Sequence, residues 1–308
     1  MSTLLENVDE YLALRRTLGF KLDRAGRLLR DFVTHLERHS SSVITVELAL
    51  AWAKQPPDAD SSWWSTRLGV VRVFARHLRA IDPRTEVPPR ELLPARSRRA
   101  TPYLYSPREV AQLMHAAHIF RSPFKAQTYA TIIGLLAVTG LRIGEAIRLD
   151  RQDVDFAEGV LLIHKTKFDK SREVPLHTAT TEALRAYARR RDQHWPKPKT
   201  PSFLVSTAGT RLLYSNVQLC FGALARAAGL ERRSERCRPR IHDLRHTFAV
   251  QTLLGWYRTG VDVEANLPRL STYLGHVAPS CTYWYLSAAP ELLQLAAARL
   301  EPRMGDEA

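Results

Sequence analysis

His242-Asp243-Leu244-Arg245 follows an arginine-rich run and precedes an apolar segment at residues 247–254 that is typical of a buried helix. On a helix, His242 and Arg245 are three residues apart and share one face. An imidazole and a guanidinium in that arrangement can bind one phosphate, with the arginine as a bidentate donor. A histidine beside an apolar run is more often a packed core residue. The pair therefore indicates a site only if the chain also supplies a second arginine, a proton donor and a nucleophile.

The chain carries a large excess of positive charge. Its 308 residues include 45 lysines and arginines against 31 aspartates and glutamates, which gives a net charge of +14. Such an excess favours a polyanion as partner, although an ordinary basic protein is the alternative. A chain of this length is long enough for two domains with separate hydrophobic cores.

The cysteines and the hydropathy of the chain argue against a disulfide-rich, zinc-binding, membrane-spanning or secreted protein. Cys220, Cys237 and Cys281 are odd in number and widely separated, which indicates neither a disulfide framework nor a zinc site. No apolar run approaches the roughly 18 residues of a membrane span, and the N-terminus lacks the basic-then-apolar order of a signal peptide. We therefore expect a cytoplasmic protein without a metal, a cofactor or a membrane partner.

The pattern of residues 1–81 predicts a compact helical domain. Thr3 and Glu6 have the spacing of a capping box, and further helices are expected around residues 28–36, around 45–52 and after Ser62. Apolar side chains of the last helix point inward, and arginines decorate it. The basic face is expected to bind DNA, whereas a solvated surface is the alternative for any single arginine. The candidates are Arg67, Arg72 and Arg76.

Residues 82–104 are expected to link this domain to a second one. Prolines at five positions exclude a continuous helix, and several arginines make the segment basic. A stiff basic linker suits a protein that wraps a DNA duplex, with Arg98 and Arg99 as DNA-binding candidates. It would also suit a plain connector.

The second domain is expected over residues 105–300. It opens with a capping box that begins at Ser106, and a longer helix ends at Gly140. Arg142 follows this glycine-permitted bend, and Glu145 stands three residues further on. A carboxylate at that spacing can orient the guanidinium, although a surface ion pair is the alternative.

Residues 160–164 and 172–176 have the pattern of the two strands of a β-hairpin. A hairpin tip rich in lysine can reach into a groove of DNA. The lysines of this tip are Lys165, Lys167 and Lys170.

Two helices and a short strand are expected after the hairpin. The helices lie near residues 179–194 and 215–228, and the strand near 203–206. Ser215 is expected to open the second helix, because Gln218 stands in the capping-box position. The arginine-rich run that follows supplies two more DNA-binding candidates, Arg238 and Arg240. An apolar helix is expected at 290–300, before a tail at 301–308.

Five motifs in this order resemble the tyrosine recombinases of the phage integrase family. They are Thr139 to Glu145 (TGLRIGE), Lys167 in a hairpin, His242 to His246 (HDLRH), Leu274 to His276 (LGH) and Tyr285 nine residues later. No single motif is decisive, but their order and intervals are specific, and the resemblance covers residues 106–300. The N-terminal helices resemble the family's core-binding domain only in size and helical character. The resemblance implies a mainly α fold with a small β-sheet or hairpin, arranged as a two-domain C-shaped clamp.

The resemblance also implies a role for each matching residue. Tyr285 attacks a phosphodiester and forms a 3′-phosphotyrosyl link, which conserves the bond energy for rejoining. Arg142 and Arg245 hold the scissile phosphate and balance the charge of the transition state. Lys167 protonates the leaving 5′-oxygen, a role worth ~10²–10⁴ in rate.

The two histidines and the glutamate have supporting roles in this scheme. His242 and His276 bind the phosphate or assist proton transfer from the tyrosine, and Glu145 supports Arg142. The implied function is site-specific recombination or integration of DNA, for a mobile element, without a metal or cofactor.

The same residues have alternative assignments. His242 and His246, four residues apart, resemble a zinc-binding helix, but Asp243 stands where a metalloprotease places glutamate. Tyr283 competes with Tyr285 as nucleophile, and the interval from the preceding histidine favours Tyr285. Lys165 and Lys170 likewise compete with Lys167, which the family's spacing from the returning strand favours.

Two other classes of protein remain as alternatives. A type IB topoisomerase would use the same tyrosine chemistry, but recombinases pass a helix like the one at residues 290–300 to a neighbouring subunit. A DNA-binding regulator would need no complete set of candidate catalytic residues. The implied partners are double-stranded DNA and further copies of the chain in a homotetramer, or other recombinase subunits, joined by exchange of the C-terminal helix.

Overall fold

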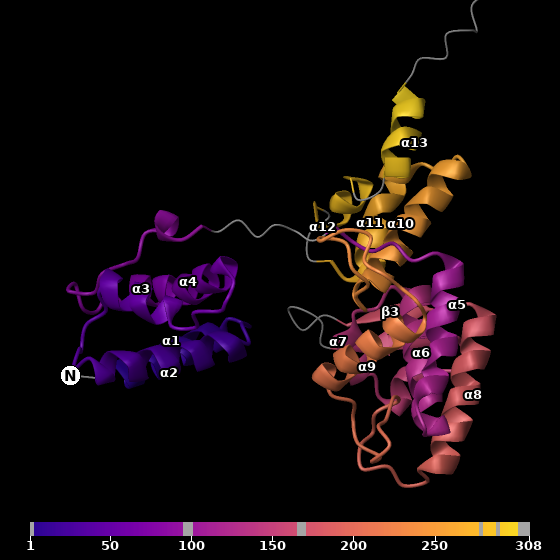
Figure 1. Ribbon diagram of the computed structural model, residues 1–308, viewed down its shortest axis with the longest axis horizontal. Helices are drawn as coiled ribbons and strands as arrows, with labels where there is room; N and C mark the ends of the chain where they lie inside the picture. The colour runs from indigo at the N-terminus through magenta and orange to yellow at the C-terminus, as the bar shows by residue number, and fades with distance from the viewer. Residues whose placement is uncertain (1–2, 95–100, 165–170, 277–279, 288–289, 301–308) are drawn as a thin grey trace, which may run out of the picture. The chain divides into compact units, whose positions relative to one another are not determined.

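The computed structural model describes residues 3–94, 101–164, 171–276, 280–287 and 290–300 (Figure 1). The chain divides into two compact units, residues 1–99 and 100–308. No helix among the described residues combines the length and the apolar character needed to cross a membrane.

The first unit is a small helical bundle. Its elements are α1 (Leu4–Thr17), α2 (Asp23–Arg38), α3 (Val46–Lys54), α4 (Ser61–Leu78) and the short 3₁₀ helix η1 (Arg90–Leu92). Thr3 and Glu6 exchange the two hydrogen bonds of the predicted capping box at the start of α1. Figure 1 shows α1 and α2 side by side, with α3 and α4 packed on them. Phe32, Trp52 and Phe74 are fully buried in the core between these helices.

The second unit is mainly helical and contains one small antiparallel sheet. Its helices before the sheet are α5 (Pro107–His115), η2 (Ala116–Ile119), α6 (Pro123–Thr139), α7 (Ile143–Arg148) and η3 (Arg151–Asp153). The strands are β1 (Val154–Asp155), β2 (Val160–Ile163) and β3 (Arg172–Pro175). The helices after the sheet are α8 (Thr178–His194), α9 (Tyr214–Ala227), α10 (Asp243–Arg258), α11 (Val263–Leu274), α12 (Ser280–Tyr283), η5 (Trp284–Ser287) and α13 (Pro290–Leu300). The strand order is β1-β2-β3, and Leu161 pairs with Val174 in the buried part of the predicted hairpin.

Two hydrophobic clusters form the core of the second unit. One extends from α5 and α6 through the sheet to α8 and α9, and the other lies among α10, α11, η5 and α13. Helix α10 contributes Leu244 to the first cluster and Val250 to the second. The N-terminal end of α10, which carries the His242–Arg245 motif, therefore lies where the two clusters meet.

The C-terminal helix α13 packs against α10 of its own chain (Figure 1). Leu292 is 1% exposed, and Glu291 forms an ion pair with Arg258 of α10. Leu293, the next residue, is 54% exposed. In the single chain, α13 thus covers its own domain, whereas the resemblance implies a helix that is passed to a neighbouring subunit.

Two local predictions differ from the structure. Helix α9 begins at Tyr214 after Leu213, without a side-chain cap, so the cap predicted at Ser215 is wrong. The Gln218 side chain donates instead to the Tyr214 hydroxyl at 2.9 Å. In the segment predicted as a strand at 203–206, the structure has an isolated bridge from Val205 to Arg211.

Candidate active site

A glycine turn places Arg142 at the start of α7. Gly140 ends α6 with a φ of 61°, and a Cβ at this position would lie 2.5 Å from the Phe248 ring. Glycine is required there because of both the backbone conformation and the space. Arg142 Nη1 donates to Glu145 Oε1 at 2.9 Å, and its Nη2 donates to the Gly275 carbonyl at 3.0 Å. The predicted contact between Arg142 and Glu145 is therefore present.

Arg245 lies in the first turn of α10 with a buried guanidinium. The residue is 2% exposed, and it donates to the carbonyls of Gly140 at 2.8 Å and Leu274 at 2.7 Å. Both acceptors are neutral. Burial, followed by the charge of Arg142, lowers the pKa of Arg245 to about 10. Arg245 therefore remains charged at neutral pH.

The turn before α10 is held by the buried carboxylate of Asp243. This group accepts hydrogen bonds from Arg240 at 2.8 and 2.9 Å and from the Tyr103 backbone at 3.2 Å. His242 precedes it, on the same turn as Arg245. Burial, followed by the charges of nearby arginines, lowers the pKa of His242 to about 4, although part of the residue is exposed. The imidazole is therefore neutral at pH 7.

His276 follows the last residues of α11 and lies beside the candidate nucleophile. Its Nδ1 is hydrogen-bonded to Thr282 Oγ1 at 2.7 Å. Its ring stacks on Tyr285, with centroids 5.9 Å apart and planes 21° from parallel. Burial, followed by the charges of neighbouring arginines, lowers the pKa of His276 to about 4. This imidazole is neutral as well, and Thr282 fixes its orientation.

The two candidate tyrosines have different environments. Tyr285, in η5, is 3% exposed, and its ring centroid lies 5.4 Å from that of His246 and 5.5 Å from that of Trp284. Tyr283 is 50% exposed. Of the two hydroxyl-bearing rings, Tyr285 is the one that packs against the histidines of the site.

Arg172, at the start of β3, belongs to the site and was missed from the sequence. Its guanidinium donates to both oxygens of Glu145, at 2.8 and 3.1 Å, and its Nε donates to the Tyr273 carbonyl at 2.8 Å. Thr282 was missed as well, and His246, which the sequence indicated only as part of a motif and as an alternative zinc ligand, packs against Tyr285. Their contacts join residues far apart along the chain or depend on side-chain orientation, so no local pattern indicates them.

Some predicted residues lie outside the described part of the chain. They are the candidate proton donor Lys167 and the DNA-binding candidates Lys165, Lys170, Arg98 and Arg99.

The remaining DNA-binding candidates differ in how far their side chains are exposed to solvent. Arg67 is 7% exposed, stacks over the Trp52 ring at 3.8 Å and donates to the Trp52 carbonyl at 2.9 Å. We correct its assignment, because a guanidinium enclosed in this way does not face a DNA backbone. Arg72 donates to the carbonyls of residues 88 and 89, and Arg240 pairs with the carboxylate that holds α10. Arg76 and Arg238 are exposed.

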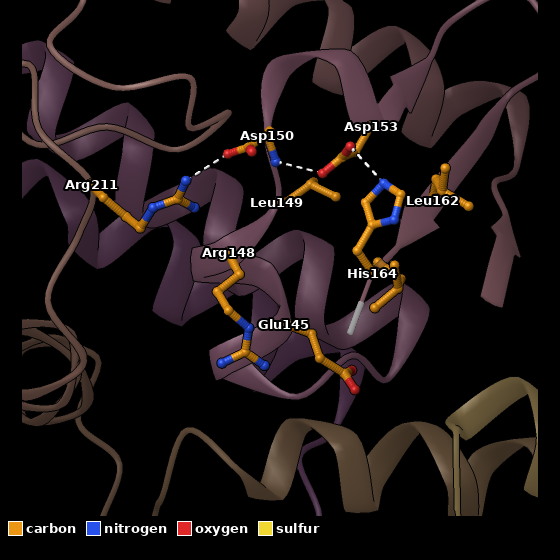
Figure 2. A pocket seen from close by; sticks show the side chains of 9 residues that line it. Glu145, Arg148, Leu149, Asp150, Asp153, Leu162, His164 and Arg211 are labelled. Carbon is orange, nitrogen blue, oxygen red and sulfur yellow. Dashed lines mark hydrogen bonds and ion pairs between the residues drawn. The ribbon is translucent and has the colours of Figure 1, made fainter. Parts of the chain in front are cut away.

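A pocket of about 440 Å³ lies beside α7 and includes Glu145 in its wall (Figure 2). Figure 2 shows Arg211 bonded to Asp150, at 2.6 Å, and His164 beside Asp153, with 3.1 Å between Nε2 and Oδ1. Two polar pairs of this wall, Arg211 with Asp150 and His164 with Asp153, are thus bonded to each other. No cluster of three or more potential metal ligands occurs in the part of the chain that the structure describes.

Comparison with known proteins identifies relatives of the whole chain. Residues 104–291 match the model of the phage integrase family. A putative integrase/recombinase of Sinorhizobium fredii, y4rB, is 48% identical over 99% of this chain and 99% of its own length. The tyrosine recombinase XerC of Azotobacter vinelandii is 28% identical over 71% of this chain and 67% of its own length.

Solved structures share the fold. The Tn1549 transposon integrase in complex with transposon right-end DNA has a TM-score of 0.64 at 16% identity, over 97% of this chain and 99% of that chain. A lambda integrase tetramer bound to a Holliday junction has a TM-score of 0.63 at 17% identity, over 92% of this chain and 77% of that chain. At such identities the likeness concerns the fold alone. The family match and the full-length relative carry the assignment: this chain belongs to the phage integrase family and is a tyrosine-type site-specific recombinase.

Proposed function

We propose that this chain breaks and rejoins double-stranded DNA through a 3′-phosphotyrosyl link at Tyr285, as the recombinase of a mobile element. The observation that carries the proposal is the excess of positive charge beside that tyrosine. Arg142, Arg172 and Arg245 are gathered around one carboxylate, Glu145, and both histidines of the site are neutral. A phosphodiester supplies the missing negative charge and accepts hydrogen bonds from guanidinium groups.

The reaction needs charge balance and two proton transfers. Arg142 uses one N–H on Glu145 and one on Gly275, which leaves further donors for the non-bridging oxygens of the phosphate. Arg245, fixed by two carbonyls, provides a second preorganised charge, so both guanidiniums stabilise the transition state. The hydroxyl oxygen of Tyr285 forms a bond to phosphorus as the bond from phosphorus to the 5′-oxygen breaks. We propose that His276, whose neutral ring stacks on that of the tyrosine, assists loss of the phenolic proton.

The test is covalent capture of DNA. Labelled duplexes from the DNA that flanks this chain's gene are incubated with the protein and separated under denaturing conditions. We expect an adduct with the wild type and with Tyr283→Phe, and none with Tyr285→Phe, which should still bind DNA. An adduct that persists in Tyr285→Phe and vanishes in Tyr283→Phe would assign the other tyrosine. No adduct with any duplex would overturn the proposal, and plasmid relaxation without strand exchange would indicate a topoisomerase.

Lys167 is proposed as the acid that protonates the departing 5′-oxygen. Lys167→Ala should slow cleavage of an ordinary phosphodiester, by ~10²–10⁴ for a well-placed acid. The loss should be much smaller when sulfur replaces the bridging 5′-oxygen, because a thiolate leaves without a proton. Lys165→Ala is the matched control. A sulfur rescue seen with Lys165→Ala and not with Lys167→Ala would mean that Lys165 is the acid.

DNA binding is proposed to use the basic residues that the sequence indicates, without Arg67. Arg76 and Arg238 are exposed and can reach a phosphate backbone. Each phosphate that the protein neutralises should contribute about −0.9 to the slope of log K against log salt concentration. A slope near zero would remove DNA from the list of partners.

Assembly on DNA is proposed to involve four copies of the chain, or this chain with other recombinase subunits. Helix exchange would require α13 to leave α10 and uncover Leu292. A chain that ends at Ala289 should then bind a single site and assemble poorly. If the truncated chain unfolds instead, the role of α13 is to cover its own domain.

A further inference from the structure

The C-terminal end of α11 binds three arginines that come from three different segments of the second unit. The contacts are Arg172 Nε to the Tyr273 carbonyl at 2.8 Å, Arg245 Nη2 to the Leu274 carbonyl at 2.7 Å, and Arg142 Nη2 to the Gly275 carbonyl at 3.0 Å. The last carbonyls of a helix lack partners within the helix and carry partial negative charge. The end of α11 therefore fixes three guanidiniums relative to one another, and His276 is the next residue.

Glu145 joins two of these arginines a second time. Its Oε1 accepts from Nη1 of Arg142 at 2.9 Å and Nη1 of Arg172 at 3.1 Å. Its Oε2 accepts from Arg172 Nη2 at 2.8 Å and from the Arg142 backbone N–H at 3.0 Å. Burial raises the pKa of Glu145, but hydrogen bonds and charge from Arg172, followed by those from Arg142, lower it to about 2. Glu145 is thus a charged, fully bonded link between α7 and β3.

The Arg172 guanidinium fits closely against the turn after α11. The Arg172 side chain is 10% exposed, and a Cβ on Gly275 would lie 2.7 Å from Arg172 Nη1. Gly275 also has a φ of 67°, a conformation that favours glycine. The planar fork that donates through Nε and both Nη atoms cannot be reproduced by the single ammonium group of lysine.

Loss of Arg172 would change the partners of Arg142. Glu145 is 4% exposed, and Arg142 would remain as its cationic partner among the described residues. A buried carboxylate with a single arginine favours a two-point ion pair. The N–H donors of Arg142 would then turn toward Glu145 and away from a bound phosphate.

We propose that Arg172 is a positioning residue for DNA cleavage: it holds Glu145 and the end of α11 so that Arg142 faces the scissile phosphate. This inference rests on the function proposed for the site. Arg172 acts through Glu145 and Arg142 and does not itself touch the reacting atoms.

The test compares the rate of adduct formation at saturating DNA with the dissociation constant for DNA. We expect Arg172→Ala and Arg172→Lys to form the adduct about 100-fold more slowly than the wild type, the order of loss when a reacting group is misplaced by ~1 Å. The dissociation constant should not change. The defect should shrink on a duplex whose scissile phosphate carries a methyl group in place of one non-bridging oxygen, because that charge no longer needs Arg142. A purely structural defect would slow both duplexes equally.

Arg211→Ala is the matched control. Arg211 lies in the same unit and also bonds a carboxylate, Asp150, at 2.6 Å and a carbonyl, that of Ile147, at 2.9 Å, but neither partner belongs to the site. It should lower stability and leave the rate of adduct formation by folded protein unchanged. If Arg172→Ala does not fold, Arg172→Lys decides.

The outcomes separate this inference from the proposed function. A wild type that forms the adduct, with folded Arg172 variants that form it at the same rate, overturns the positioning role alone. Equal slowing on the charged and the methylated duplex also overturns it. A wild type that forms no adduct with any duplex overturns the proposed function, and the positioning role with it.

Discussion

Each unit of this protein buries an arginine on a long helix, and the two arginines are balanced differently. Arg67 of α4 lies over the Trp52 ring, donates to the Trp52 carbonyl and pairs with Asp31 at 3.5 Å. Arg245 of α10 donates to two neutral carbonyls, beside a second arginine, Arg142. The first charge has a carboxylate and an aromatic face in its own unit. Among the described residues, the second donates to carbonyls and shares the one nearby carboxylate, Glu145, with two further arginines.

The partners of a buried arginine distinguish a structural residue from a candidate anion site. A guanidinium that is enclosed with a carboxylate is part of the fold, because its charge is neutralised there. A guanidinium that is held by carbonyls keeps its full charge while its direction is fixed. A second cation beside it makes the free state electrostatically unfavourable, and a bound phosphate removes that repulsion. Arg67 thus stabilises the helical bundle, whereas Arg245 has the environment that we propose binds a phosphate.

The largest expected effect is on cleavage. Arg245→Ala should slow adduct formation by ~10²–10³, the loss typical of one preorganised donor to the transition state. Arg67→Met should leave the rate at saturating DNA unchanged, because Arg67 faces its own core. Rates of single-turnover adduct formation check both variants. Equal slowing by the two changes would break the distinction between a ligand-facing and a structural arginine.

The next effect is on the free energy of unfolding, and here Arg67 is the residue whose loss should matter. Arg67→Met removes a hydrogen bond to a buried carbonyl and leaves Asp31 without this partner, which should lower the free energy of unfolding by about 1–3 kcal/mol. Arg76→Met, on the exposed face of the same helix, should change it by less than ~0.5 kcal/mol. Denaturant unfolding followed by circular dichroism measures both. A larger loss in Arg76→Met would contradict the internal role of Arg67.

The helical spacing of Arg67 indicates a buried position, whereas its residue type favours an exposed one. It lies three residues after Trp64 and four before Val71, both of which were predicted to point inward. The structure buries it in the same stripe as Leu68 and Val71. The residue type favoured a solvated surface, and the partner that allows burial, Trp52 on α3, is a tertiary contact that spacing on one helix does not show.

Sequence patterns predicted the features that depend on neighbouring residues, such as helix caps and hairpin strands. The capping boxes at Thr3 and Ser106, the helix end at Gly140 and the hairpin strands depend on neighbouring residues, and the structure has all of them. Arg172 depends on contacts 27 residues away along the chain, to Glu145, and 101 residues away, to Tyr273. No periodicity carries such information. The surface on which α13 packs is also a tertiary property, because its apolar face could be buried either on its own domain or on a neighbouring subunit.

A third effect is the pH dependence of stability, which arises from two histidines near the arginines of the second unit. The folded-state pKa values of His242 and His276 are about 4, below the value of about 6.5 in an unfolded chain. Unfolded protein therefore binds more protons between these values, so stability is fully present above about pH 6.5 and is lost as pH falls toward 4. Unfolding measured at several pH values should show this loss, and His276→Gln should reduce it. A variant that loses stability as steeply as the wild type would mean that other groups dominate.

The smallest expected effect is binding of inorganic phosphate by the free protein. If Arg245 and Arg142 form an anion site, phosphate should stabilise the folded state, by about 0.4 kcal/mol when its concentration equals the dissociation constant. Phosphate also stabilises proteins generally, because it is excluded from their surfaces. The informative quantity is therefore the increment over chloride at equal ionic strength, compared among variants. The wild type and Arg67→Met should share one increment, and Arg245→Met should show a smaller one, whatever its own stability. The same increment in all three proteins would mean that carbonyl-held and carboxylate-held arginines do not differ in anion binding, and the contrast between the two units would fail.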